Sequence, residues 1–256
     1  MFSMSGGNNI LLQELCLGFD VFLCFGIPII GFLLLRKKAD RMLKPFLLGM
    51  AAFVISQMLI RIPLLQYVLP NFQWFLMLQA QPYAYGIFLG VTAGIFEETA
   101  RLLFLQKFLK GNTRLWYGLS FGLGHGGIEA ILLVGINNLT ALILYPLGYL
   151  NLSDISYFSI LLGGIERIFA IAFHTGATLV VLHGIRVQKS GRYTLLAILL
   201  HGLLDSMLVI LPAAFSISVA GLEVYIMVVS FLVLLFGLRF FSHRTKNGQK
   251  ATGNNL

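Results

Sequence analysis

Hydrophobic runs long enough to cross a lipid bilayer, which takes roughly 20 apolar residues, recur from one end of this chain to the other. A backbone inside lipid must satisfy its own hydrogen bonds, so such runs fold either as helices or as the strands of a closed barrel. Barrel strands are about half as long and alternate between apolar and polar residues, unlike these runs. The sequence therefore predicts an all-α, polytopic bundle of transmembrane helices.

Composition indicates that the membrane domain is the whole of this chain. Of the 256 residues, 58% are hydrophobic, only 11% are charged, and 22 are Phe. A water-soluble domain of this size would need a more polar surface. We therefore expect residues 1–256 to form a single integral membrane domain with no soluble domain attached.

The apolar runs predict about seven spans, and one stretch leaves the number open. Residues 137–151 would prolong the fourth span, fold back, or form a separate short helix that makes eight. The expected spans are 10–35, 45–69, 83–105, 115–134, 160–185, 193–213 and 222–240.

The net charge of +8 is arranged for membrane orientation rather than for nucleic-acid binding. Most of the 18 Lys and Arg residues lie in alternate connections and in the C-terminal tail, whereas the intervening connections carry Asp154 and Glu223 and no Lys. This positive-inside pattern predicts an outside N-terminus, a cytoplasmic C-terminus and a basic cytoplasmic tail at 241–256. The four basic stretches are 36–44, 107–114, 186–192 and 239–250.

Ionisable residues interrupt four consecutive runs at about the same depth. Acids and histidines are costly in lipid, so they persist only where they face the protein interior or a water-filled cavity. At a rise of ~1.5 Å per residue, these side chains lie roughly 13–19 Å from the inner ends of their helices. We therefore expect them to share one hydrated layer in the cytoplasmic half of the bilayer, within a four-helix catalytic core at 83–213. The residues of this layer are Glu97, Glu98, His125, His174, His201 and Asp205, with Arg101 one turn from the acid pair.

Three further ionisable residues lie deeper in their helices. By depth, Glu129, Glu166 and Arg167 fall toward the outer half of the membrane. Because buried charges usually find partners, we interpret Glu166 and Arg167 as an internal pair rather than as catalytic groups.

The two adjacent acids predict a division of roles. Glu97 and Glu98 point about 100° apart on a helix, and Arg101 is within pairing reach of both. One carboxylate can be held ionised by Arg101 while the other faces the cavity as a general base for water. His201 and Asp205, one turn apart, would hydrogen-bond the oxyanion of a tetrahedral intermediate, or Asp205 would orient His201.

The same residue types also suit zinc. His125 and Glu129 are spaced i,i+4, as are His201 and Asp205, which is usable ligand geometry. The His-Glu-x-x-His signature of helical metalloproteases is absent. We expect no obligatory cofactor, with zinc as the alternative; its ligands would then be His125, Glu129, His174 and His201.

Two runs carry glycines at four-residue spacing, which lets helices approach backbone to backbone in lipid. One ladder leads into Glu97 and the other into His125. We expect the third and fourth spans to pack on each other through these ladders and to present both side chains to one cavity. The ladders are Gly86, Gly90 and Gly94, and Gly118, Gly122 and Gly126.

Taken together, these motifs resemble those of a known group of enzymes. Glu-Glu-x-x-Arg, Phe-x-x-x-His and His-x-x-x-Asp, in this order on separate membrane helices, are similar to motifs of the glutamic intramembrane proteases: the type II CAAX prenyl endopeptidases and the bacterial CPBP proteins. This resemblance covers 83–213. Phe-Glu-Glu-Thr-Ala-Arg, with Gly-His-Gly-Gly-Ile-Glu-Ala, Ala-Phe-His-Thr and His-Gly-Leu-Leu-Asp, resembles most the bacterial YhfC family, over nearly the whole chain.

The resemblance implies roles for the residues of the first two motifs. Glu97 would be the base that activates water, His125 would hold the same water, and Glu98 with Arg101 would support it. The CAAX enzymes usually have one more residue between the acid pair and the Arg, which puts the role of Arg101 in doubt.

The resemblance also implies that His201 and Asp205 stabilise the oxyanion. Asp205 stands where the group often has Asn, which weakens that assignment. His174 and Glu129 are additional candidates for the site.

We therefore expect an endopeptidase in the bacterial plasma membrane that cleaves a membrane protein or lipidated peptide with a Glu-activated water and binds no nucleic acid. Use of prenylated substrates does not follow from the sequence. The alternatives are a zinc-dependent intramembrane metalloprotease, an ion- or proton-coupled transporter that uses the same acids, and a non-catalytic relative. A transporter would be expected to show paired broken helices or a repeat of one half in the other, which the sequence lacks.

Overall fold

The structure is a computed structural model that describes residues 5–110, 112–152 and 155–242. Every regular element in these residues is a helix, so the expected all-α class is confirmed. Asp154 and the basic tail from residue 243 onward lie outside the described residues, and the expectations about them remain predictions.

The first two spans are helices interrupted by π-helical turns, and a short helix follows them. The first span consists of α1 (Ser5–Val21), η1 (Phe22–Gly26) and α2 (Ile27–Arg36). The second consists of α3 (Leu43–Phe53), η2 (Val54–Arg61), η3 (Leu64–Val68) and η4 (Leu69–Asn71), and α4 (Gln73–Gln79) comes next.

The other spans are longer and more regular. They are α5 (Pro82–Phe108); α6 (Leu115–Ala130) with η5 (Ile131–Gly135) and α7 (Ile136–Leu144); α8 (Tyr157–Arg186); α9 (Ser190–Phe215); and α10 (Val219–Ser242). Because α6 continues through η5 and α7 to Leu144 as one long helix, residues 137–144 prolong the fourth span, and they form no separate eighth span.

Six helical segments of the described chain are long and apolar enough to cross a membrane. Helix α5, of 27 residues, is the seventh long helix, and its Glu97, Glu98 and Arg101 are buried inside the bundle. We count α5 as a span, because 27 residues at ~1.5 Å each exceed the ~30 Å of a hydrocarbon core. The protein is thus a polytopic helical bundle with the span number that the sequence predicts.

Local sequence explains where two of these helices begin. Pro82 occupies the first turn of α5, where its missing N–H has no helical partner to lose. The side chain of Ser156 accepts a hydrogen bond from the backbone N–H of Phe158 and so caps the start of α8. Both helices contribute to the polar centre described below.

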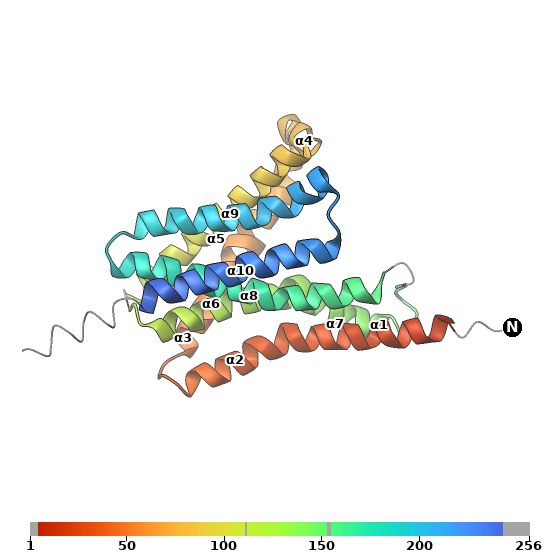
Figure 1. Cartoon of the computed structure of the whole chain (residues 1–256), viewed down its shortest axis with the longest axis horizontal. Helices are drawn as coiled ribbons and strands as arrows, with labels where there is room; N and C mark the ends of the chain where they lie inside the picture. Colours follow the sequence, from red (N-terminus) through yellow and green to blue (C-terminus); the bar gives the residue numbers. More distant parts are fainter. Residues whose placement is uncertain (1–4, 111, 153–154, 243–256) are drawn as a thin grey trace, which may run out of the picture.

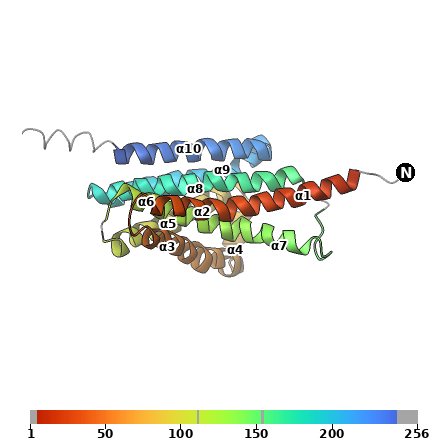
Figure 2. The same cartoon turned by 90° about the horizontal axis from the view of Figure 1, so that it is seen from below.

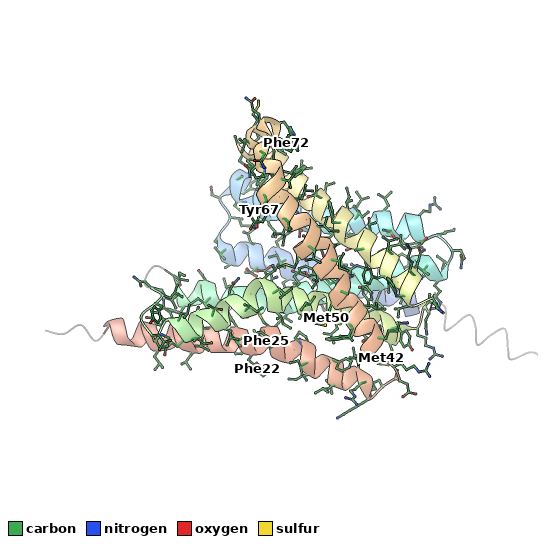
Figure 3. All side chains as sticks on the ribbon, turned by 180° about the vertical axis from the view of Figure 1, so that it is seen from behind. Phe22, Phe25, Met42, Met50, Tyr67 and Phe72 are labelled. Atoms are coloured by element: carbon green, nitrogen blue, oxygen red, sulfur yellow. The ribbon has the colours of Figure 1, made fainter. Side chains whose placement is uncertain are left out.

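The spans do not all run parallel. In Figure 1, α8, α10 and the span α1–α2 lie side by side along the long axis, whereas α5 slopes across α9. Seen from behind, the second span crosses the bundle obliquely from Met42 toward Tyr67 (Figure 3). The start of α1 and the end of α10 lie at opposite ends of the long axis (Figures 1 and 2), as an odd number of crossings requires.

The glycine ladders pair different helices from those that the sequence suggested. A Cβ at Gly90 would lie 2.3 Å from the carbonyl oxygen of Gly202, so this ladder packs α5 on α9. A Cβ at Gly122 would lie 2.4 Å from Cα of Thr175, so the other ladder packs α6 on α8. The expectation that the two ladders pack on each other is wrong, because spacing shows that a helix face permits close approach without showing which helix approaches it.

Candidate active site

A cavity of about 180 Å³ lies among α3, η2, α5, α6, η5, α8, α9 and α10. Phe173 and Leu204 form part of its apolar wall. Its polar lining is Gln57, Arg61, Glu97, Glu129, Glu166, Arg167, His174, His201 and Asp205. Most of the ionisable residues singled out from the sequence therefore line one partly open cavity.

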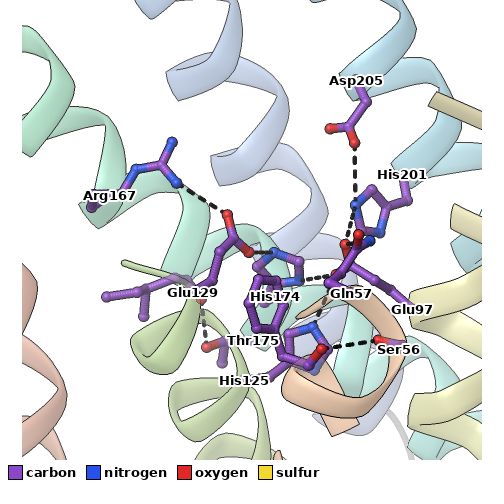
Figure 4. Close-up of polar contacts among 12 residues, drawn as sticks. Ser56, Gln57, Glu97, His125, Glu129, Arg167, His174, Thr175, His201 and Asp205 are labelled. Carbon is purple, nitrogen blue, oxygen red and sulfur yellow. Dashed lines mark hydrogen bonds and ion pairs between the residues drawn. The ribbon is translucent and has the colours of Figure 1, made fainter. Parts of the chain in front are cut away.

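Glu97 on α5 lies at the centre of the polar contacts. Its Oε1 accepts a hydrogen bond of 2.5 Å from the side-chain amide of Gln57, and its Oε2 lies 2.9 Å from Nε2 of His125 (Figure 4). His174 Nδ1 and His201 Nε2 approach the carboxylate from the other side, each at 3.8 Å. Glu97 is thus held from behind and faces two further imidazoles.

Glu98 points about 100° away from Glu97 around the axis of α5 and pairs with Arg101. The guanidinium contacts the two carboxylate oxygens at 2.8 and 3.1 Å, and neither residue has exposed surface. Arg101 also donates to the carbonyl oxygen of His174 and to Oγ1 of Thr178. One acid is therefore locked in an ion pair while its neighbour faces the cavity.

His174 and His201 each have one ring nitrogen against a buried carboxylate. His201 Nδ1 lies 2.9 Å from Glu98 Oε1, and His174 Nε2 lies 2.5 Å from Glu129 Oε2. The other nitrogen of each ring is the one that approaches Glu97. A carboxylate on one nitrogen fixes the orientation of an imidazole. This leaves Nε2 of His201 for a ligand or for water, whereas Nδ1 of His174 also lies 3.0 Å from Nη2 of Arg101.

Glu129 lies closer to the centre than its depth along the helix suggested. Besides approaching His174, it accepts a hydrogen bond of 3.1 Å from Arg167, which also pairs with Glu166. The pairing of Glu166 with Arg167 is present as expected, and Glu129 extends it to the histidines. Counting residues along a helix does not reveal this contact, because it depends on how α6 and α8 face each other and on the reach of the glutamate side chain.

His125 and Asp205 lie on opposite sides of the centre. His125 has no exposed surface, packs edge-on against Phe53 and is not part of the cavity lining, so it supports Glu97 from behind. Asp205 keeps a third of its side chain exposed toward the cavity, and its Oδ2 lies 3.6 Å from His201 Nε2. A water in the cavity therefore meets Asp205 more directly than His125.

Three of these residues fit the requirements of a metal site. Within the described residues, Glu97, His174 and His201 each offer one ligand atom, and the three atoms lie within 4.8 Å of one another. One carboxylate with two imidazoles is a known donor set of catalytic zinc, and the buried carboxylates behind the two rings match the usual surroundings of zinc-bound histidines. The group differs from the zinc ligands expected from sequence, since it includes Glu97 and leaves out His125 and Glu129.

Sequence reasoning missed Gln57 and Arg61, which reach the centre from η2 and thus from outside the expected core at 83–213. Arg61 donates to the side-chain oxygen of Gln57 at 3.1 Å, and Gln57 donates in turn to Glu97. A signal was present, because Gln57 and Arg61 are polar residues four apart in the middle of an apolar run. Their π-helical turn is also of a kind that is frequent at functional sites.

The fold and the centre together define the class of protein: a multi-pass membrane protein that encloses a carboxylate–histidine cluster between its spans. The family model described as YhfC intramembrane metalloprotease matches residues 23–149 and 149–229 of this chain. The chain therefore belongs to the YhfC family.

A curated relative agrees with this assignment. The chain is 30% identical over 232 residues to a protein of Bacillus subtilis (strain 168) named Uncharacterized membrane protein YhfC. The matched region covers 82% of this chain and 89% of the relative. No solved structure matches the chain. The relative supports a bacterial, multi-pass membrane protein, and the family description supports a peptidase over a transporter. The wider relation to the CPBP and CAAX proteins is not shown by these matches and remains a prediction.

Proposed function

We propose that this protein hydrolyses a peptide bond of a membrane protein or lipidated peptide inside the bilayer, and that Glu97, His174 and His201 hold one zinc ion at the reacting centre. One observation carries the proposal: two imidazoles, each with a buried carboxylate behind it, turn their remaining nitrogens toward the same carboxylate. The chemistry that zinc supplies when bound is Lewis acidity, which polarises a carbonyl group and acidifies water.

The protein's own residues have distinct tasks in this proposal. Gln57 and His125 hold Glu97 in one orientation. Asp205 faces the cavity beside His201, where its carboxylate can take a proton from water and return it to the leaving amine. The enclosing helices keep bulk water away from these charges, which strengthens their interactions.

A metal-free reaction is the second candidate, and one contact favours it. Arg101 Nη2 lies 3.0 Å from Nδ1 of His174, the nitrogen that would face the ion, and a guanidinium and a metal ion repel each other there. In this version His174 and His201 hold a water, and Glu97 is the base that deprotonates it. Both versions need Glu97. The zinc version adds a metal ion and assigns the proton transfer to Asp205, whereas the metal-free version assigns it to Glu97.

Metal analysis of the purified full-length protein separates the two candidates. The zinc version predicts about one zinc per chain, its loss in His174→Ala and His201→Ala, and inactivation by a chelator that added zinc reverses. The metal-free version predicts that activity persists in the presence of chelator. It also predicts that any zinc in the wild-type protein stays bound when His174 or His201 is replaced. Activity is measured by mass spectrometry of membrane peptides incubated with the reconstituted protein. Cleavage that is equal in wild type and Glu97→Gln would contradict both versions.

A further inference from the structure

Arg61 lines the cavity and differs from two other arginines of the bundle in the groups that hold it. Arg61, Arg101 and Arg167 lie within the spans, away from the basic stretches at the helix ends. Arg101 pairs with Glu98, and Arg167 pairs with Glu129 and Glu166. Among the described residues, no carboxylate forms an ion pair with Arg61. A guanidinium inside a membrane is costly without an anion, so a missing partner needs a reason.

Neutral groups hold Arg61 in place instead. Its Nε donates to Oγ1 of Thr92 at 3.2 Å, and Nη2 donates to the carbonyl oxygen of Leu89 at 2.6 Å. Nη1 donates to Oε1 of Gln57 at 3.1 Å. Three of the five N–H groups of the guanidinium are thereby used, which leaves one on each terminal nitrogen. A guanidinium is planar and can bind a carboxylate through both of its oxygens when a donor is left on each of two nitrogens.

Arg61 also lies close to the reacting centre. It lines the same cavity as Glu97 and His201, and Gln57 links it to Glu97. Along this chain of contacts, Arg61 Nη1 is no more than about 8 Å from Glu97 Oε1, allowing for the width of one amide. An extended peptide advances about 3.5 Å per residue, so an anion held by Arg61 would lie within two or three residues of a bond being cut.

On this evidence we propose that Arg61 is a specificity-determining residue that binds a carboxylate of the substrate, either a C-terminal carboxylate or an Asp or Glu side chain, within two or three residues of the scissile bond. The proposal rests on the proposed proteolytic function for the meaning of the scissile bond. The carboxylate-binding step itself requires only the cavity and Arg61, so it can be tested without hydrolysis.

The test uses the full-length Glu97→Gln protein in detergent and measures the dissociation constants of apolar hexapeptides. One pair differs only in a C-terminal acid or amide, and a second pair only in an internal Asp or Asn. We expect the acid of one pair to bind about 10- to 100-fold more tightly than its neutral partner, the range of a charged hydrogen-bonded contact. The pair that shows the preference identifies the source of the carboxylate.

Second-site variants decide whether Arg61 is the cause. Arg61→Gln in the same background should reduce the acid-to-neutral ratio to about one, Arg61→Lys should keep part of it, and the exposed Arg239→Gln should keep all of it. Each measurement is repeated in the presence of chelator. If a bound metal rather than Arg61 held the peptide carboxylate, chelator would abolish the preference for the acidic peptide even in the protein that keeps Arg61. The proposal would be overturned if the protein that keeps Arg61 bound acid and neutral peptides equally or bound neither. It would also be overturned if Arg61→Gln left the acid-to-neutral binding ratio unchanged. The proposed function fails on a different result, namely cleavage that does not depend on Glu97.

Discussion

The two faces of α5 put adjacent, chemically identical residues into opposite surroundings. On one face, Glu98 has no exposed surface and is bound by the guanidinium of Arg101 and by His201. On the other face, Glu97 borders the cavity, and its hydrogen-bond partners are the amide of Gln57 and the ring of His125. A fully paired acid stabilises the bundle, whereas an acid without a fixed cation is available to bind an ion or a proton.

The arginines repeat this contrast. Arg101 is enclosed and paired, whereas Arg61 borders the cavity and is held by neutral groups. Arg101 and Glu98 thus have their ion-pair partners within the protein. In our proposals, Glu97 and Arg61 instead bind a partner from outside, a metal ion or a proton in one case and a substrate carboxylate in the other. Three charge substitutions test this distinction, and a glycine substitution tests the contact of α5 with α9 that positions His201.

Glu97→Gln should have the largest effect of these substitutions, and the effect should be a loss of activity rather than of stability. The neutral amide can neither accept a proton nor match the charge of a metal, so we expect the rate of peptide cleavage to fall by about 10²- to 10⁴-fold. The melting temperature should change little, because no arginine or lysine in the part of the chain that the structure describes forms an ion pair with Glu97. A variant that unfolds instead of losing activity would place Glu97 with the structural charges.

Arg101→Gln should have the largest effect on stability. It leaves Glu98 buried without its cation, which costs about 3–5 kcal/mol of unfolding free energy. The measurement is thermal or denaturant unfolding in detergent. Adding Glu98→Gln should recover part of the loss, since the unpaired charge is then removed. A double variant that is less stable than Arg101→Gln alone would contradict the pairing argument.

Gly90→Ala should have an intermediate effect on stability. Its Cβ would lie 2.3 Å from the carbonyl oxygen of Gly202, so α9 must move away from α5, at a cost of about 1–3 kcal/mol. Because His201 precedes Gly202, cleavage should fall as well. Gly163→Ala is the matched control, since nothing lies within 4 Å of its Cβ and the same measurements should show no loss. Equal behaviour of the two variants would show that α5 and α9 tolerate separation.

Asp20→Asn should have the smallest effect. Asp20 on α1 is fully buried, and its Oδ2 accepts a hydrogen bond of 3.0 Å from Asn138, but no basic side chain of the described residues pairs with it. With no ion pair to break, the unfolding free energy should change by less than about 1 kcal/mol. A loss as large as that of Arg101→Gln would show that burial alone, rather than pairing, decides which acids stabilise this bundle.

Features within one helix could be predicted from the sequence. The positions of the spans follow from apolar length. That Arg101 pairs with one of the two adjacent acids follows from a spacing of three or four residues on one helix, although this spacing alone did not choose Glu98 over Glu97. The gathering of acids and histidines follows from the cost of leaving them in lipid. In each case the determining neighbours are a few residues away along the chain.

Features that depend on how helices meet could not be predicted in this way. The sequence does not show that Gln57 reaches Glu97 from 40 residues away, or that His125 supports Glu97 from behind while His174 faces it. Nor does it show that the ladder of Gly90 packs on α9. By itself the sequence determined a helical membrane protein with buried acids and histidines. Only the tertiary structure decided which of them converge, because the rotation and tilt of each helix result from the packing of many side chains at once.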